Sequence, residues 1–148
     1  MSTVSTTRRL DEVETGDALG PLEVPLTRTV IVATAIASRD YQDVHHDPAL
    51  AVERGSPDIF MNILTTNGFV GRFVTDWAGP GARITAVSIR LGVPNYPGDT
   101  MVLTGSVTGK EPGEPGEADG AAGIAVLSVR GANSRGDHVT GTVRVALP

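Results

Sequence analysis

A change in hydrophobic period constrains this chain more than any other feature of its sequence. In the segment 59–77, apolar residues recur at steps of three and four, which is typical of one long buried helix. They are Phe60, Ile63, Leu64, Val70, Phe73, Val74 and Trp77. In the segments 87–93 and 139–147, apolar and polar residues instead alternate, which predicts strands. The Gly-Pro-Gly sequence at 79–81 lies between the two patterns and predicts the end of the helix.

Other segments complete the predicted fold. Two more strands are expected at 100–108 and 123–131, and a turn is expected at 133–138 before the last strand. Upstream, 21–26 predicts a first strand. The segment 28–40 is ambiguous, because its valines and isoleucines favour a strand while its alternate alanines favour a helix; we predict a helix. Together these elements predict an α+β domain in which an antiparallel sheet wraps around one long central helix.

The chain of 148 residues is long enough for one domain with a real core, but short for an enzyme that encloses a large substrate alone. We expect a polar flexible tail at 1–17 and the domain at 18–148. The segment 108–123 is rich in glycine, proline and glutamate and predicts a mobile loop between two strands. Gly68 and Gly71 weaken the central helix but would let another backbone come close.

Composition excludes several classes of function. A net charge of −5 provides no basic excess for nucleic acid, and no apolar stretch approaches the length of a membrane span. The absence of cysteine excludes disulfides and thiolate chemistry, and it suits a cytoplasmic protein. We therefore expect neither a nucleic-acid partner nor a membrane partner.

The stretch "RDYQDVHHDP", at 39–48, gathers three carboxylates, two imidazoles and a tyrosine. On an unbroken helix, Asp40 and His45 would point roughly 140° apart and could not act together. Pro48 disfavours helical geometry at the residue before it, and aspartates favour turns, so the chain is expected to leave the helix after Asp40. In such a turn the two side chains can converge.

These residues resemble a known signature. "SRDYQDVHHDPALA" at 38–51 is similar to the motif of the MaoC-like, (R)-specific enoyl-CoA hydratases, and "NYPGDTMVLTGSV" at 95–107 resembles that family's Pro-Gly-Asp turn into a strand. The resemblance covers the chain from about Leu22 to Leu147. Within the family, "RDYQDVHHD", "DIFMNILT" and "VTDWAGP" most resemble the small subunit of a two-subunit actinobacterial hydratase of a steroid side-chain enoyl-CoA.

The resemblance implies a hot-dog fold and syn addition of water to a trans-2-enoyl thioester. It implies that Asp40 and His45 are the catalytic pair, with no cofactor, because CoA is part of the substrate. A carboxylate and an imidazole could hold one water between them, and either could be the base. The enolate oxygen would need donors, which the N-terminus of the central helix can supply.

Two positions depart from the family pattern. Single-subunit hydratases carry a His-Gly pair where this chain has Met61 and Asn62, and the glycine N–H is their oxyanion donor. Asn62 still offers its backbone N–H, but its side chain is expected to crowd the approach of the thioester. Their serine further along the helix aligns with Val70 or its neighbour. These losses suggest a pocket shared with a second hot-dog subunit, as a heterodimer or a dimer of heterodimers.

Two other functions remain open. The chain could be a non-catalytic subunit that completes a partner's acyl-CoA tunnel, as the changes at Asn62 and Val70 would allow. It could also be an acyl-CoA thioesterase, which needs an acidic residue near the central helix, and Asp58 and Asp76 are the candidates there.

The remaining polar residues of the stretch have ordinary explanations. Adjacent side chains such as His46 and Asp47 point apart, so we expect no metal site. Asp47 is expected to cap a short helix that begins with Pro48. We expect Asp43 to be a solvated turn residue and Tyr41 to serve packing. His138 follows a Gly-Asp turn and is expected at the surface.

Overall fold

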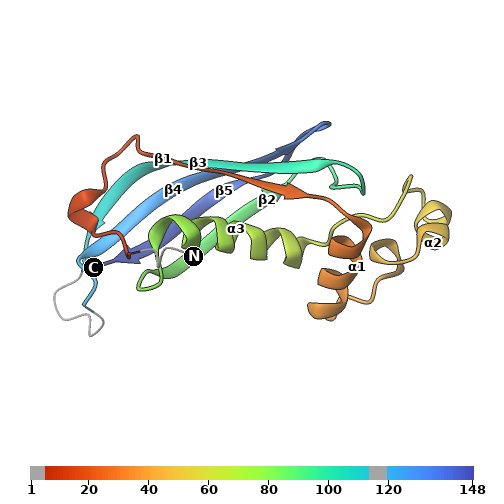
Figure 1. Cartoon of the computed structure of the whole chain (residues 1–148), viewed down its shortest axis with the longest axis horizontal. Coiled ribbons are helices and arrows are strands. Elements are labelled where there is room, and N and C mark those ends of the chain that lie inside the picture. The colour runs from red at the N-terminus through yellow and green to blue at the C-terminus, as the bar shows by residue number, and fades with distance from the viewer. Residues whose placement is uncertain (1–5, 114–119) are drawn as a thin grey trace.

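The computed structural model describes residues 6–113 and 120–148, in which a five-stranded antiparallel sheet arches over one long helix (Figure 1). The strands are β1 (Ala18–Pro25), β2 (Arg83–Leu91), β3 (Thr100–Pro112), β4 (Gly123–Asn133) and β5 (Gly136–Leu147), in the order β1-β3-β4-β5-β2. The helices are α1 (Arg28–Ala37), α2 (Pro48–Glu53) and α3 (Ile63–Ala78), with short 3-10 helices η1 (Leu10–Glu12) and η2 (Asp43–His45). The predicted α+β hot-dog arrangement is confirmed, as is the helix at α1.

Helix α3 begins later than the apolar pattern predicted. Asn62 is its N-cap, and the Asn62 side chain accepts a hydrogen bond from the Thr65 N–H. The residues before Asn62 are not helical. Ile63 and Leu64 are each 51% exposed, so the first turn is not buried as predicted. The predicted stop is confirmed, because Gly79 ends α3 with a φ of 94°, a conformation that glycine adopts without strain.

The hydrophobic core lies between the inner face of α3 and the concave face of the sheet. Val70 and Val74 on α3 are fully buried, as are Leu103 of β3 and Leu127 of β4. Burial of each such side chain contributes about 1.5–3 kcal/mol to folding. Alternate residues of β4 are buried, which is the pattern expected of a strand with one face on a core.

Strand β2 is an edge strand with exposed residues on both faces. It pairs with β5 on one side only, and Val87 and Leu91 are 36% and 38% exposed. On the outer side of α3, no heavy atom lies within 4 Å of the position of a Cβ at Gly68. The close backbone approach expected at this glycine therefore does not occur within the described chain.

The N-terminal segment differs from the predicted tail. The Arg8 N–H bonds the Ala78 carbonyl oxygen at 2.8 Å, and the Leu10 N–H bonds the Pro148 oxygen at 2.8 Å. Val13 is fully buried in the core. A flexible tail is therefore wrong for residues 6–17, because apolar residues between the charged ones dock against α3 and the end of β5. The rest of the predicted tail, 1–5, lies outside the described residues.

The predicted mobile loop at 108–123 is shorter in the structure. Strand β3 continues to Pro112, and β4 begins at Gly123, so the ends of the predicted loop belong to the sheet. Residues 114–119 lie outside the described part of the chain.

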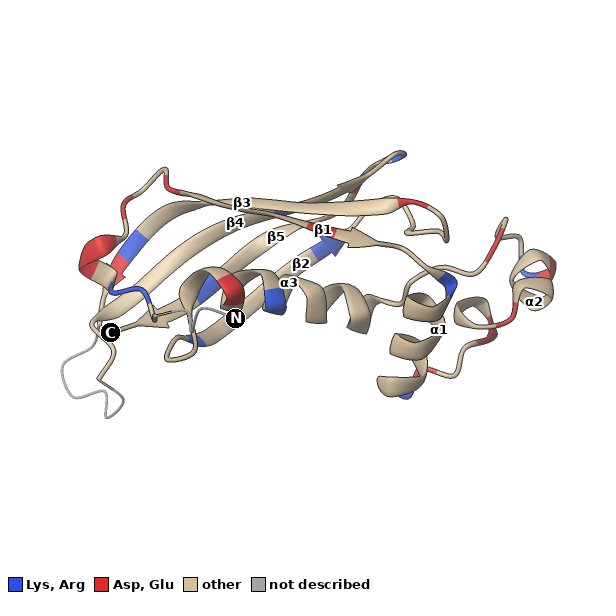
Figure 2. Ribbon diagram, in the orientation of Figure 1, with Lys and Arg blue, Asp and Glu red and all other residues tan. Residues whose placement is uncertain are grey.

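Helices α1 and α2 lie together beyond the N-terminal end of α3, at one end of the molecule (Figure 1). Acidic residues gather around α2 and the turn before it, whereas α3 carries no charged residue from Ile63 to Gly71 (Figure 2). No helix among the described residues is both long enough and apolar enough to cross a bilayer.

Candidate active site

Asp40 lies at a sharp turn of the backbone directly after α1. Ser38 is the C-cap of α1, and Arg39 adopts a left-handed conformation with a φ of 56°. That conformation is uncommon for a residue with a side chain, and it turns the chain away from the helical path. The Asp40 N–H then bonds the Ala35 carbonyl oxygen at 2.9 Å. The chain leaves the helix before His45, as expected, but α1 ends at Ala37, three residues earlier than predicted.

Short elements hold the segment between Asp40 and α3. Asp47 caps α2 by accepting from the Leu50 N–H at 3.1 Å, with Pro48 in the first turn, as predicted. Asp43 is not a solvated turn residue, because its Oδ1 lies 2.6 Å from Nε of Arg54. This ion pair ties η2 to the end of α2. Tyr41 is 65% exposed, so the packing role predicted for it is also wrong.

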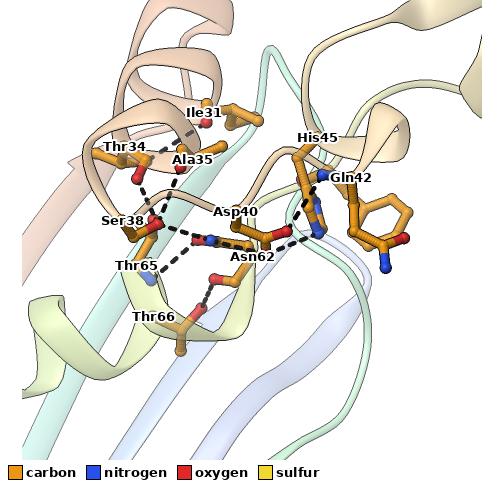
Figure 3. Close-up of polar contacts among 11 residues, drawn as sticks. Ile31, Thr34, Ala35, Ser38, Asp40, Gln42, His45, Asn62, Thr65 and Thr66 are labelled. Carbon is orange, nitrogen blue, oxygen red and sulfur yellow. Dashed lines mark hydrogen bonds and ion pairs between the residues drawn. The ribbon is translucent and has the colours of Figure 1, made fainter.

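Asp40 and His45 converge, as the sequence predicted. Asp40 Oδ2 and His45 Nε2 are 3.4 Å apart (Figure 3). The His45 residue is 8% exposed, while the Asp40 side chain is 22% exposed, so the pair lies at the wall of a cavity that opens to the surface.

The hydrogen bonds of His45 determine its tautomer. Nδ1 lies 2.7 Å from the carbonyl oxygen of Phe60, which can only accept a hydrogen bond. The Nδ1 atom must therefore carry a hydrogen, and in the neutral imidazole Nε2 presents a lone pair toward Asp40. The Phe60 ring also meets the imidazole edge to face at 5.0 Å. The imidazole is thereby held in one orientation.

Asn62 joins the pair of Asp40 and His45 to the first turn of α3. Its Nδ2 lies 3.0 Å from Asp40 Oδ2 and 2.9 Å from Ser38 Oγ, and its Oδ1 accepts from the Thr65 N–H at 3.0 Å (Figure 3). The residue is 2% exposed. The side chain was expected to crowd the approach to its own backbone N–H, but it instead folds against Ser38, Asp40 and Thr65.

The surroundings of Asp40 favour its charged form. The Asn62 side-chain hydrogen bond is the largest cause of a pKa below the usual value, and partial desolvation opposes it. The Gln42 N–H, 3.3 Å from Oδ1, and the nearby imidazole lower the pKa further. Asp40 is therefore a carboxylate near neutral pH.

The N-terminus of α3 presents free donors beside this pair. Among the described residues, the N–H groups of Asn62, Ile63 and Leu64 have no hydrogen-bond acceptor. The N-terminus of a helix also carries a partial positive charge. This end of α3 can therefore stabilise an oxyanion.

A cavity of about 310 Å³ brings these groups together. Its lining residues are Asp40, His45, Phe60, Met61, Asn62, Ile63, Leu91, Gly92, Val93, Pro94 and His138. A second, apolar groove of about 350 Å³ lies between α1 and α3, and Ser38 is among its lining residues. Apart from Asp40, His45, Asn62 and His138, the side chains that line the first cavity are apolar.

His138 was expected at the surface, but it is 2% exposed and lines the cavity. Its Nδ1 lies 2.7 Å from the Val93 carbonyl oxygen, and its Nε2 lies 2.8 Å from Thr66 Oγ1. Nδ1 must donate to the carbonyl, so in the neutral ring Nε2 accepts from the hydroxyl. Burial lowers the pKa of His138, which agrees with this assignment. His138 joins β5 to α3.

The acidic residues that a thioesterase would need lie elsewhere. Asp58 pairs with Arg28 through both carboxylate oxygens, at 2.9 and 2.6 Å. Asp76 lies near the C-terminal end of α3, is 60% exposed and pairs with Arg72. Neither residue lines the cavity of Asp40 and His45.

Sequence reasoning missed three contributors to the site, which are the Asn62 amide group, the Ser38 hydroxyl and the Phe60 carbonyl. An N-cap asparagine before the periodic apolar run was a usable signal for Asn62, but the helix was predicted to start too early. Val70 is fully buried in the core, so a hydroxyl at that position would not reach the cavity.

Comparisons with known proteins identify the family of this chain. The family model described as "MaoC like domain" matches residues 12–129. The 3-oxo-4,17-pregnadiene-20-carboxyl-CoA hydratase beta subunit of Mycobacterium tuberculosis is 47% identical over 132 residues, which are 89% of this chain and 95% of that protein.

Solved structures agree as well. A chain of the ChsH1-ChsH2 complex from Mycobacterium tuberculosis has a TM-score of 0.83 at 46% identity, over 91% of this chain and 98% of that one. The (R)-hydratase from A. caviae involved in PHA biosynthesis has a TM-score of 0.76 at 25% identity, over 92% and 98% of the two chains. The resemblance drawn from residues 38–51 and 95–107 is thus confirmed, and the chain belongs to the MaoC like domain family.

Proposed function

We propose that this chain is the catalytic member of a two-subunit enoyl-CoA hydratase, a hydro-lyase that adds water across the double bond of a trans-2-enoyl thioester. The observation that carries the proposal is the pair of acceptor atoms 3.4 Å apart, Asp40 Oδ2 and His45 Nε2, at a helix N-terminus with free N–H groups. A hydration site needs both features, because water must be activated while charge develops on the thioester oxygen.

One water can bridge the pair. A carboxylate oxygen and an unprotonated imidazole nitrogen do not bond each other, but each can accept one hydrogen of the same water. The imidazole is ordinarily the stronger base, and the lowered pKa of Asp40 widens that difference. His45 therefore takes a proton as the water oxygen attacks Cβ. Asp40 orients the water and stabilises the imidazolium that forms.

The cycle closes without a cofactor. As the C–O bond forms at Cβ, the π electrons move toward the thioester oxygen, where the N–H groups at the start of α3 can receive the enolate charge. The imidazolium then returns its proton to Cα from the same face. One C–O and one C–H bond have formed, one water is consumed, and both side chains regain their starting states. Addition on one face is the expected stereochemistry.

The size of the site supports a shared pocket and a partner. A cavity of about 310 Å³ lies at the lower end of the range for small-molecule sites, and it cannot enclose a large acyl group together with CoA. We infer that a second hot-dog subunit completes the tunnel, in a heterodimer or a dimer of heterodimers.

The 47% identical relative is named for a steroid side-chain CoA thioester, and this chain takes a substrate of that class. The chain is located in the cytoplasm, where acyl-CoA thioesters occur and where proteins need no disulfides.

The assembled complex provides the test. The chain is co-expressed with its partner, and an enoyl-CoA substrate is followed by the loss of the conjugated enoyl absorbance. A thiol reagent in parallel detects free CoA. Loss of absorbance without free thiol is the expected result. Release of thiol would instead indicate a thioesterase, and silence in both assays would indicate a subunit that only shapes a partner's tunnel.

A further inference from the structure

The buried side chain of Asn62 makes three hydrogen bonds. Its Nδ2 donates to Asp40 Oδ2 at 3.0 Å and to Ser38 Oγ at 2.9 Å, while Oδ1 accepts from the Thr65 N–H at 3.0 Å. The Ser38 hydroxyl is free to accept, because its own hydrogen points to the Thr34 carbonyl oxygen at 2.7 Å. Both hydrogens of the Asn62 amide are therefore used.

Only one orientation of this amide satisfies its neighbours. If the oxygen and nitrogen of Asn62 exchanged places, the oxygen would face the Asp40 carboxylate and the nitrogen would face the Thr65 N–H. Two acceptors would then face each other at Asp40, and two donors would face each other at Thr65. The residue is 2% exposed, so water could not satisfy these groups. The donor directed at Asp40 is consequently fixed by the N-cap of α3 itself.

The Asn62 amide binds the same Asp40 oxygen that faces His45. Asp40 Oδ2 receives the Asn62 N–H and also faces His45 Nε2, whereas Oδ1 receives the Gln42 N–H at 3.3 Å. Each carboxylate oxygen thus has a donor that limits rotation of the group. The same asparagine starts the helix whose free N–H groups lie beside the pair.

We infer that the side-chain amide of Asn62 is a positioning residue that holds the Asp40 carboxylate against His45 and locks it to the first turn of α3. The inference rests on the proposed hydratase function. Through this amide, the group that orients water and the donors that stabilise the enolate belong to one rigid unit. The side-chain amide acts on the reacting water through Asp40, whereas the backbone N–H of Asn62 is one of the free donors at the start of α3.

Two substitutions separate this role from helix capping. Asn62→Asp and Asn62→Ser both keep an N-cap acceptor for the Thr65 N–H, but neither can donate to Asp40 as the amide does. Asn62→Asp also places a second carboxylate beside Asp40. In the assembled complex, we expect kcat to fall about 10- to 100-fold with KM changed less than about threefold, because the substrate contacts remain while the carboxylate is misplaced.

The matched control is Thr27→Ala, which removes the same kind of cap from α1, a 3.0 Å bond from the Val30 N–H, without touching Asp40. It should leave kcat within about threefold of the wild type, because the contacts of Asp40 remain. Equal losses in the Thr27 and Asn62 variants would show that only helix capping is involved, and would overturn the inference.

A direct measurement in the unaltered complex completes the test. The carboxyl carbon of Asp40 and the side-chain amide of Asn62 are labelled and titrated by NMR. The Asn62 amide resonances should follow the titration of Asp40 with the same midpoint, and in Asn62→Asp the pKa of Asp40 should rise. If the Asn62 amide resonances do not change as Asp40 titrates, the inference is overturned, even if the variants fail to assemble. Normal turnover of Asp40→Asn would instead overturn the proposed function, so the two failures are distinguishable.

Discussion

Nε2 of His45 lies 3.4 Å from Oδ2 of Asp40, although the two residues are five positions apart and would diverge on a continuous helix. The left-handed Arg39 and the 3-10 turn η2 bring them together. The carbonyl of Phe60 then orients the imidazole, and the side-chain amide of Asn62 orients the carboxylate.

Loss of either member of the pair should abolish hydration. We expect Asp40→Asn and His45→Ala to lower kcat/KM of the complex by about 100-fold or more, since each removes a group bound to the reacting water. The neighbouring imidazole gives the control, because His46 does not line the cavity and His46→Ala should be active. Circular dichroism and the enoyl absorbance assay measure fold and activity. Near-normal turnover in either of the first two variants would remove that residue from the mechanism.

The pH dependence should identify the base. The pKa of Asp40 is lowered, first by the Asn62 hydrogen bond, so this carboxylate stays charged between pH 5 and 8. Imidazole groups ordinarily titrate near pH 6.5, and a protonated Nε2 cannot accept from water. We therefore expect kcat/KM to fall as the pH drops below about 6. A profile that stays flat from pH 5 to 8 would exclude an imidazole base.

Buried His138 should make stability depend on pH. Burial lowers its pKa in the folded chain, so the unfolded chain binds more protons. The stability that its neutral form supports is complete above the unfolded pKa, near 6.5, and is lost as the pH falls toward the folded value. Urea unfolding at pH 8 and pH 5 measures the loss. His138→Asn should reduce the difference between the two pH values, and an unchanged difference would assign it to other groups.

The isolated chain should be inactive or poorly soluble. Ile63, Leu64, Val87 and Leu91 are exposed apolar residues on α3 and on the edge strand β2, and the cavity is small. Unpaired strand edges and apolar patches of this kind favour association with another chain. Size-exclusion chromatography with light scattering, followed by the hydration assay with and without the second subunit, gives the measurement. A well-behaved homodimer with full turnover would contradict the prediction.

Much of the fold could be predicted from local pattern. The change from a period of 3.6 to a period of 2 predicted α3 and the strands, because side-chain direction repeats with the backbone geometry of each element. The cap at Asp47, the stop at Gly79 and the convergence of Asp40 and His45 also depend on residues close in sequence. Such features follow from turn and capping chemistry that a few neighbouring residues carry.

Other features were decided only by tertiary packing. His138 is buried because β5 passes beside α3, and Thr66, 72 positions away, supplies its partner. Leu10 and Val13 belong to the fold because the end of β5 and the core cover them. The Asn62 amide reaches Asp40 across 22 positions. Burial and long-range hydrogen bonds depend on which segments meet in space, and hydrophobic periodicity does not contain that information. The sequence alone therefore predicted most of the elements and the convergence of Asp40 and His45, while the tertiary structure determined how that pair is held.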